Sequence, residues 1–326
     1  MVKLMANAWA KAKGANAKKE EPVVEKRDLR AHYADLFDRK RERTQAIRCA
    51  LVGKENTAKT GTAVDLALQH LKKVGKKGAG VAIFDVDNSA IQTIAANYPD
   101  HDNIFVIPLY DELDDTIFND DNSTNYTALI DKMGHFINIV AQKCRDGEIG
   151  AVIMDGMSTF LKWCEHAMTD VLMNRSKNPV NVEDGDKFNQ AEWRIRNQLF
   201  RDIANRAHQL PVDAVFFTFH LKDKKQFADV GNGQKGLMKI GEEPEWEKGT
   251  MRLFSQQLWM TRYTKKGDLA AGVKADASLD EGAWEIRASI EEMKGFNQEH
   301  LGTTHTVLSV KDGVVQWTGL PFLTWG

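Results

Sequence analysis

Cysteine is scarce in this chain of 326 residues, which has only three. Cys49, Cys144 and Cys164 lie far apart in apolar contexts, and no two of them form a C-x-x-C spacing. This pattern argues against a disulfide framework and against a zinc site. It favours buried thiols in a reducing compartment.

Long apolar runs and a strong net charge are also missing. No run approaches the ~18 apolar residues of a membrane span, and the N-terminus lacks the apolar core of a secretory signal. We therefore expect a cytoplasmic protein with no membrane partner. The totals of 44 basic and 46 acidic residues imply no overall attraction to nucleic acid.

The charge is nevertheless unevenly distributed. Residues 1–48 hold 13 Lys and Arg against 7 Asp and Glu, a net of +6, which leaves 31 against 39, a net of −8, for the remainder. Residues 1–26 have little apolar periodicity and form a basic arm that does not fold alone. The arm is either a solubilising tail or a docking segment for another subunit or for nucleic acid. A charged helix with one apolar stripe is expected over residues 28–43.

A phosphate-binding loop is the strongest motif. The apolar run Ile47–Val52 predicts a buried strand, Gly53–Ala58 a tight loop, and Lys59 onward a helix. Backbone amides of such a loop and the positive end of the helix bind a polyphosphate, the lysine reaches its β and γ phosphates, and the hydroxyl binds Mg²⁺. The predicted nucleotide-binding residues are Gly53, Lys54, Glu55, Asn56, Thr57, Ala58, Lys59, Thr60 and Gly61.

The loop departs from the pattern G-x-x-x-x-G-K-[ST] at one position. Ala58 replaces the second glycine, which supplies unusual backbone dihedrals and close approach to phosphate. A methyl group is the smallest possible intrusion on both, so the loop is predicted to bind ATP. The alternative is an ordinary strand, turn and helix in which Lys59 and Thr60 are solvated.

Two further apolar strands end in acids. Gly80–Asn88 contains Asp85 and Asp87 at its end, and Ile149–Asp155 is a buried strand of the Walker B form. Acids at the carboxyl ends of parallel strands face the ligand crevice. Asp155 is therefore predicted to hold Mg²⁺ together with Thr60, and Asp87 to activate water. The alternative for Asp85 and Asp87 is that both cap the next helix.

The strand Pro211–His220 places a histidine where a γ-phosphate would lie. The following segment, Leu221–Gly249, has no clear periodicity and is rich in Lys and Gly, so a mobile loop that binds polyanions is predicted. Its candidate nucleic-acid-binding residues are Lys222, Lys224, Lys225, Lys235 and Lys239.

The remainder of the chain is rich in predicted strands. Trp284–Lys294 alternates in polarity, and His305–Val310 with Val314–Thr318 forms a hairpin turning at Asp312-Gly313. Lys294 is either a solvated lysine or a residue that reaches the phosphates of a neighbouring subunit.

This order of motifs resembles the RecA-like ATPase core over about residues 45–296, closest to the phage and archaeal proteins of the annealing and recombination type. The resemblance implies that Asp87 is the catalytic acid, His220 the γ-phosphate sensor and Lys294 a finger acting in trans. It also implies that segments 160–190 and 221–249 are DNA-binding loops. Aspartate at position 87, where the family usually has glutamate, is a second departure.

We therefore expect an α/β fold: a RecA-like P-loop NTPase core with a mainly parallel central sheet flanked by helices. The predicted division is a basic arm and charged helix (1–44), the core (45–296) and a C-terminal β-hairpin extension (297–326). The predicted function is ATP- and Mg²⁺-dependent binding of single-stranded DNA by a homo-oligomeric ring or filament with nucleotide at the subunit interface. Two alternatives are a DNA packaging or helicase motor and a nucleotide-bound assembly protein with little hydrolysis.

Overall fold

The computed structural model describes residues 46–175, 188, 190–229, 235–294 and 298–323. The predicted basic arm and charged helix (1–44) lie outside these residues, as does most of segment 176–189. The described residues all lie in one compact unit.

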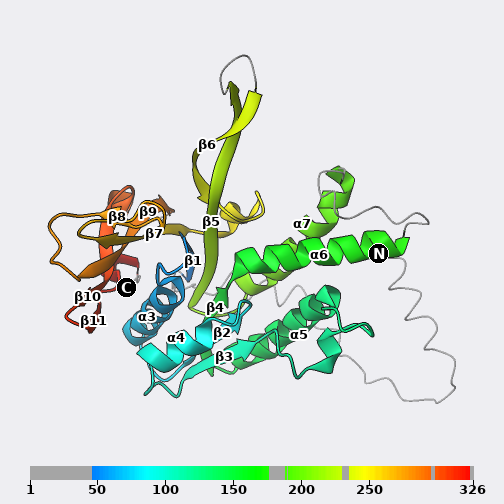
Figure 1. The fold of residues 1–326 in the computed structure, drawn as a ribbon. Coiled ribbons are helices and arrows are strands. Elements are labelled where there is room, and N and C mark those ends of the chain that lie inside the picture. Colours follow the sequence, from blue (N-terminus) through cyan, green and yellow to red (C-terminus); the bar gives the residue numbers. More distant parts are fainter. Residues whose placement is uncertain (1–45, 176–187, 189, 230–234, 295–297, 324–326) are drawn as a thin grey trace. The chain divides into compact units, whose positions relative to one another are not determined.

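The centre of this unit is a sheet of six parallel strands (Figure 1). Their spatial order is β7-β1-β5-β4-β2-β3, so one strand separates the strand of the phosphate loop from the strand that ends in Asp155. The strands are β1 (Ile47–Gly53), β2 (Gly80–Asp85), β3 (Ile104–Pro108), β4 (Ile149–Asp155), β5 (Ala214–Asp229) and β7 (Gln256–Thr264).

Helices cover both faces of this sheet. The core on one face includes side chains from α3 and α4, and the core on the other includes side chains from α5, α6 and α7. The bounds are α3 (Lys59–Lys73), α4 (Ala90–Asn97), α5 (Tyr126–Arg145), α6 (Met157–Arg175) and α7 (Gln190–His208). The predicted α/β class with a mainly parallel sheet flanked by helices is confirmed.

The sequence produces this layering because the central strands are apolar on both faces. Every residue of β2 and β4 is buried, as a strand covered by helices on both sides requires. The helices bury only one face each, with apolar residues three and four positions apart, such as Met133 and Ile137 of α5. None of the helices in the described parts of the chain is long and apolar enough to cross a bilayer.

An antiparallel extension continues the sheet beyond β7. It consists of β9 (Trp284–Met293), β10 (Thr304–Lys311) and β11 (Val314–Trp317), with the short β8 (Lys274–Ala275) beside β7. The C-terminal hairpin β10–β11 therefore belongs to the same sheet as the core. Its Trp317 packs against Gly61, where a Cβ atom would lie 2.5 Å from the indole. Short 3-10 helices occur at Asp115–Ile117, Thr250–Leu253, Gln298–His300 and Pro321–Leu323.

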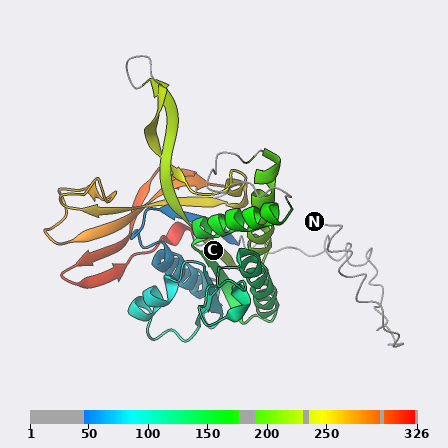
Figure 2. The ribbon, with the colours of Figure 1, turned by 45° about the vertical axis from the view of Figure 1, so that its right-hand side comes forward.

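The segment after His220 differs from its prediction. The irregular loop expected over Leu221–Gly249 is wrong: β5 continues to Asp229 and pairs antiparallel with β6 (Lys235–Pro244). Figures 1 and 2 show this β5–β6 hairpin projecting from the body. From here on, the arm means this hairpin and no longer the predicted basic segment of residues 1–26. Its described side chains beyond His220 are mostly exposed, so it lacks the apolar alternation by which strands are recognised.

Candidate functional site

The phosphate loop joins the end of β1 to the start of α3. Nζ of Lys59 donates hydrogen bonds to the carbonyl oxygens of Gly53 (3.1 Å) and Lys54 (2.7 Å). Oγ1 of Thr57 donates to the same Lys54 oxygen at 2.8 Å. The lysine thus lies inside the curve of the loop, where it would meet a bound phosphate.

Ala58 adopts the conformation that glycine normally supplies. Its φ angle is 53°, in the left-handed region, and that of Asn56 is 57°. A left-handed alanine costs about 1–2 kcal/mol relative to the right-handed conformation. The substitution therefore keeps the geometry of the loop at a cost in backbone strain.

Asp155 lies against the first turn of α3. Its Oδ2 accepts a hydrogen bond from the hydroxyl of Thr60 at 2.8 Å, so the two predicted metal ligands are in contact. Its Oδ1 accepts a hydrogen bond from Thr218 of β5 at 2.7 Å, and Thr218 in turn accepts one from the backbone N–H of Gly156 at 2.9 Å. Sequence reasoning missed Thr218, whose only signal is a hydroxyl within the apolar run of β5.

Three carboxylates converge at this point. Oxygen atoms of Asp85, Asp87 and Asp155 lie within 4.8 Å of one another. Asp85 is fully buried and accepts hydrogen bonds from the backbone N–H groups of Ser89 (3.1 Å) and Ala90 (3.0 Å), so it caps α4. Asp87 is exposed. The capping interpretation is therefore right for Asp85, while Asp87 faces the site.

The electrostatics of the trio suit a cation. The pKa of Asp155 is raised to about 6, chiefly by burial and in part by the charge of Asp87, against the lowering effect of the hydrogen bonds from Thr218 and Thr60. Burial also raises the pKa of Asp85, with a further contribution from Asp87. Carboxylates and a hydroxyl are the oxygen ligands that Mg²⁺ prefers, and a divalent ion offsets this concentrated negative charge.

Two basic groups face the acids. Burial lowers the pKa of Lys59 to about 8, although Asp155, Asp87 and Glu55 raise it in part. His220 lies opposite Gly53 in the pairing of β5 with β1, and its backbone N–H donates to Oγ of Ser158 at 2.9 Å. Burial and then Lys59 lower the pKa of its imidazole. His220 thus lies beside the loop that follows Gly53.

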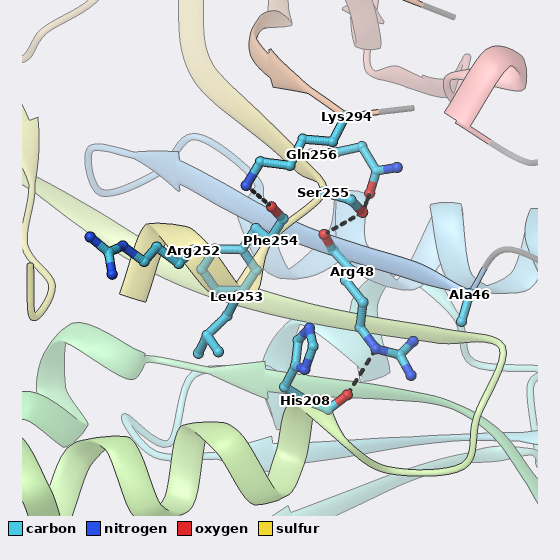
Figure 3. Close-up of a pocket in the computed structure, with 9 residues that line it drawn as sticks. All are labelled: Ala46, Arg48, His208, Arg252, Leu253, Phe254, Ser255, Gln256 and Lys294. Carbon is cyan, nitrogen blue, oxygen red and sulfur yellow. Dashed lines mark hydrogen bonds between the residues drawn. The ribbon is translucent and has the colours of Figure 1, made fainter. Parts of the chain in front are cut away.

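Lys294 is not part of this cluster. It follows β9, whose Met293 pairs with Gln256 at the start of β7, whereas Gly53 pairs with Met260 in the middle of that strand. Its Nζ donates to the carbonyl oxygen of Phe254 at 2.8 Å (Figure 3) and pairs with Glu292 at 2.9 Å. The lysine therefore lies toward the amino-terminal ends of the parallel strands, away from the loop that follows Gly53.

The lysines of the arm are partly paired with acids. Nζ of Lys222 lies 3.7 Å from Glu243, and Nζ of Lys239 lies 2.6 Å from Asp223. Lys224 and Lys225 are exposed, and the side chain of Lys235 lies outside the described residues.

The arm also contacts the phosphate loop directly. Nζ of Lys54 lies 2.7 Å from Glu242 of β6.

Comparison with known proteins adds little to this geometry. No protein-family model matches the chain, and no curated protein matches it. Among solved structures, a KaiC-like protein from the hyperthermophilic archaeon Pyrococcus horikoshii is similar at 8% sequence identity and a TM-score of 0.40. The match covers 82% of this chain and 88% of that one. A likeness at this level carries no argument about the activity of this chain.

Proposed function

We propose that the chain binds Mg-ATP at the loop Gly53–Gly61 and hydrolyses it. The observation that carries this proposal is the 2.8 Å hydrogen bond between Thr60 and Asp155, made beside Lys59 at the start of α3. A loop lysine, a helix-start hydroxyl and a strand-end carboxylate in contact are the elements that P-loop proteins use to hold a triphosphate and its metal.

Each residue has a defined task in this proposal. Lys59 would exchange the carbonyl oxygens of Gly53 and Lys54 for phosphate oxygens. Thr60 and Asp155 would hold Mg²⁺, which would supply positive charge to the phosphate oxygens. Asp87, exposed beside the metal ligands, orients and deprotonates the attacking water. His220 hydrogen-bonds the γ-phosphate.

Single-stranded DNA is the proposed partner, and a homo-oligomer the proposed assembly. The lysines of the arm support the first, because the exposed Lys224 and Lys225 lie a few residues beyond His220 and would place a polyanion site next to the nucleotide site. The position of Lys294 is compatible with the second, since this residue acts on nucleotide only across a subunit boundary. Recombination, annealing or replication are the processes that such a protein would serve.

ATP turnover by the parent and by Lys59→Ala, each with and without single-stranded oligonucleotide, tests the proposal. We expect Lys59→Ala to lose turnover at least a hundredfold, because its charge is needed on the transferred phosphoryl group. Lys72→Ala, an exposed lysine near the other end of α3, removes the same charge and should keep full activity. Unchanged turnover in Lys59→Ala would overturn the site.

The same assays separate the alternatives. Translocation or strand displacement driven by turnover would identify a motor. Rings or filaments that hold nucleotide without turnover would identify an assembly protein, a role compatible with the strained Ala58.

A further inference from the structure

A cavity of about 660 Å³ lies where the arm leaves the body. It is bounded by the first residues of the arm, the segment between β6 and β7, the N-terminal half of α7, and β7. Lys222, at its edge, follows His220 by two residues along β5, so the cavity adjoins the proposed nucleotide site without sharing a residue with the phosphate loop.

Two half-buried indoles, Trp246 and Trp259, line this cavity. Trp246 is held by Phe219, with ring centroids 5.2 Å apart, and by Phe254 at 6.3 Å. Nε1 of Trp259 is buried and has no hydrogen-bond partner among the residues that the structure describes. A buried indole N–H normally finds an acceptor, so this group is an unmet donor in a residue that lines the cavity.

The charged groups around the indoles are predominantly basic. The acids at the cavity are already paired: Glu247 with Arg201 and Glu243 with Lys222. Lys224 and Lys248 are exposed and make no ion pair with any residue in the described ranges. The uncompensated charge at the cavity is therefore positive.

We infer that this cavity takes an unpaired base of a single-stranded nucleic acid, which stacks on the indoles while its flanking phosphates contact Lys224 and Lys248. Aromatic platforms beside basic side chains are how proteins bind single strands. A base within a duplex is stacked and paired, so it does not enter a cavity. The lysines continue onto the arm, which favours a strand over a mononucleotide. The inference rests on the proposed DNA partner and assigns its bases to a site separate from the phosphate loop.

A binding titration tests the assignment. The full chain is added to a labelled short oligothymidylate, and binding is measured as the change in fluorescence anisotropy. Trp259→Leu should weaken binding about tenfold or more, and Trp259→Phe, which keeps a ring, should weaken it less. Trp284→Leu is the matched control: Trp284 stacks on Arg262, with the guanidinium carbon 4.5 Å from the ring centroid, outside the cavity, and should leave binding unchanged. The double variant Lys224→Gln/Lys248→Gln alters only exposed side chains and should reduce the slope of log affinity against log salt by about two.

The assignment would be overturned by equal binding of the oligonucleotide to a folded Trp259→Leu chain, by equal binding of duplex DNA, or by equal binding of thymidine monophosphate. The double lysine variant decides the question if Trp259→Leu does not fold, because an unchanged salt slope also overturns it. ATP binding, measured in the same samples, is expected to be lost in Lys59→Ala and kept in Trp259→Leu. Failure of the cavity is thereby distinguished from failure of the phosphate site.

Discussion

Thr218 and Asp155 are joined by a 2.7 Å hydrogen bond between two parallel strands, β5 and β4. It fixes one carboxylate oxygen while the hydroxyl of Thr60 reaches the other. Asp155 is therefore held from both sides before any metal arrives, and Thr218 is a positioning residue for the proposed Mg²⁺ site.

Removing this hydroxyl should weaken metal binding. Thr218→Val has nearly the same volume but leaves one oxygen of Asp155 and the N–H of Gly156 without their partner. We expect Mg²⁺-dependent nucleotide affinity to fall by about tenfold to a hundredfold, and unfolding free energy by about 1–3 kcal/mol. Thr218→Ser restores the hydroxyl and should recover most of the affinity. Calorimetric titration with Mg-nucleotide measures this affinity. An affinity in Thr218→Val equal to that of the parent chain would contradict the positioning role.

Ala58→Gly should stabilise the chain. The substitution relieves a left-handed alanine, worth about 1–2 kcal/mol, and makes the unfolded chain more flexible, which costs about 0.4–1 kcal/mol. A net gain of about 0–1.6 kcal/mol in the free energy of unfolding by denaturant is expected, with nucleotide affinity equal or higher. Ala63→Gly, inside α3, makes the same chemical change at a helical position and should destabilise by about 1 kcal/mol or more. Loss of stability in Ala58→Gly would show that this alanine is unstrained.

Stability and Mg²⁺ binding should respond to pH in opposite directions. The pKa of Asp155 is about 6 in the fold, above the ordinary 3.8, so the folded chain binds more protons than the unfolded chain between these values. Metal-free stability is then greatest below pH 4 for this group and falls as pH rises through 6, by up to about 3 kcal/mol. Stabilisation by Mg²⁺ grows over the same interval, because the metal needs the carboxylate.

Thermal melts from pH 4 to 7, with and without Mg²⁺, check this pH dependence. Asp155→Asn should remove the gain from Mg²⁺. Burial also raises the pKa of Asp65 to about 6, so Asp65→Asn is the control. It should reduce the fall in metal-free stability but keep the gain from Mg²⁺. A gain that is independent of pH would contradict the metal role of Asp155.

The ion pair between Lys54 and Glu242 predicts communication between loop and arm. Glu242→Gln frees the charge of Lys54 for phosphate, so triphosphate affinity should rise up to about fivefold, the range of a surface ion pair. Glu243→Gln makes the same change at the neighbouring position, where the acid pairs with Lys222, and should have no effect. Fluorescent nucleotide binding compares the two variants, and equal affinities would show that the pair does not restrain the loop.

Much of the candidate site could be predicted because it is local in sequence. The loop Gly53–Thr60 is recognisable from one strand, one turn and one helix that follow each other directly in the chain. A strand that is apolar on both faces must be covered by other elements on both faces. Once β1 and β4 are parallel members of one sheet, their carboxyl ends meet at the same edge, so the contact between Thr60 and Asp155 follows. The two strands of the arm were not predicted, because their sequence lacks the alternation of apolar residues that marks a strand. They are held by backbone pairing and by ion pairs such as that of Lys239 with Asp223.

The sequence by itself determined the α/β class, the strand, turn and helix around Gly53–Thr60, and the strand that ends in Asp155, since apolar periodicity and motif spacing are properties of short segments. Only the tertiary structure decided that Thr218 holds Asp155, that Lys294 lies toward the amino-terminal ends of the parallel strands, and that two tryptophans line a basic cavity. These relationships join residues distant in the chain, and their distances depend on strand order and register, which the packing of the whole sheet sets.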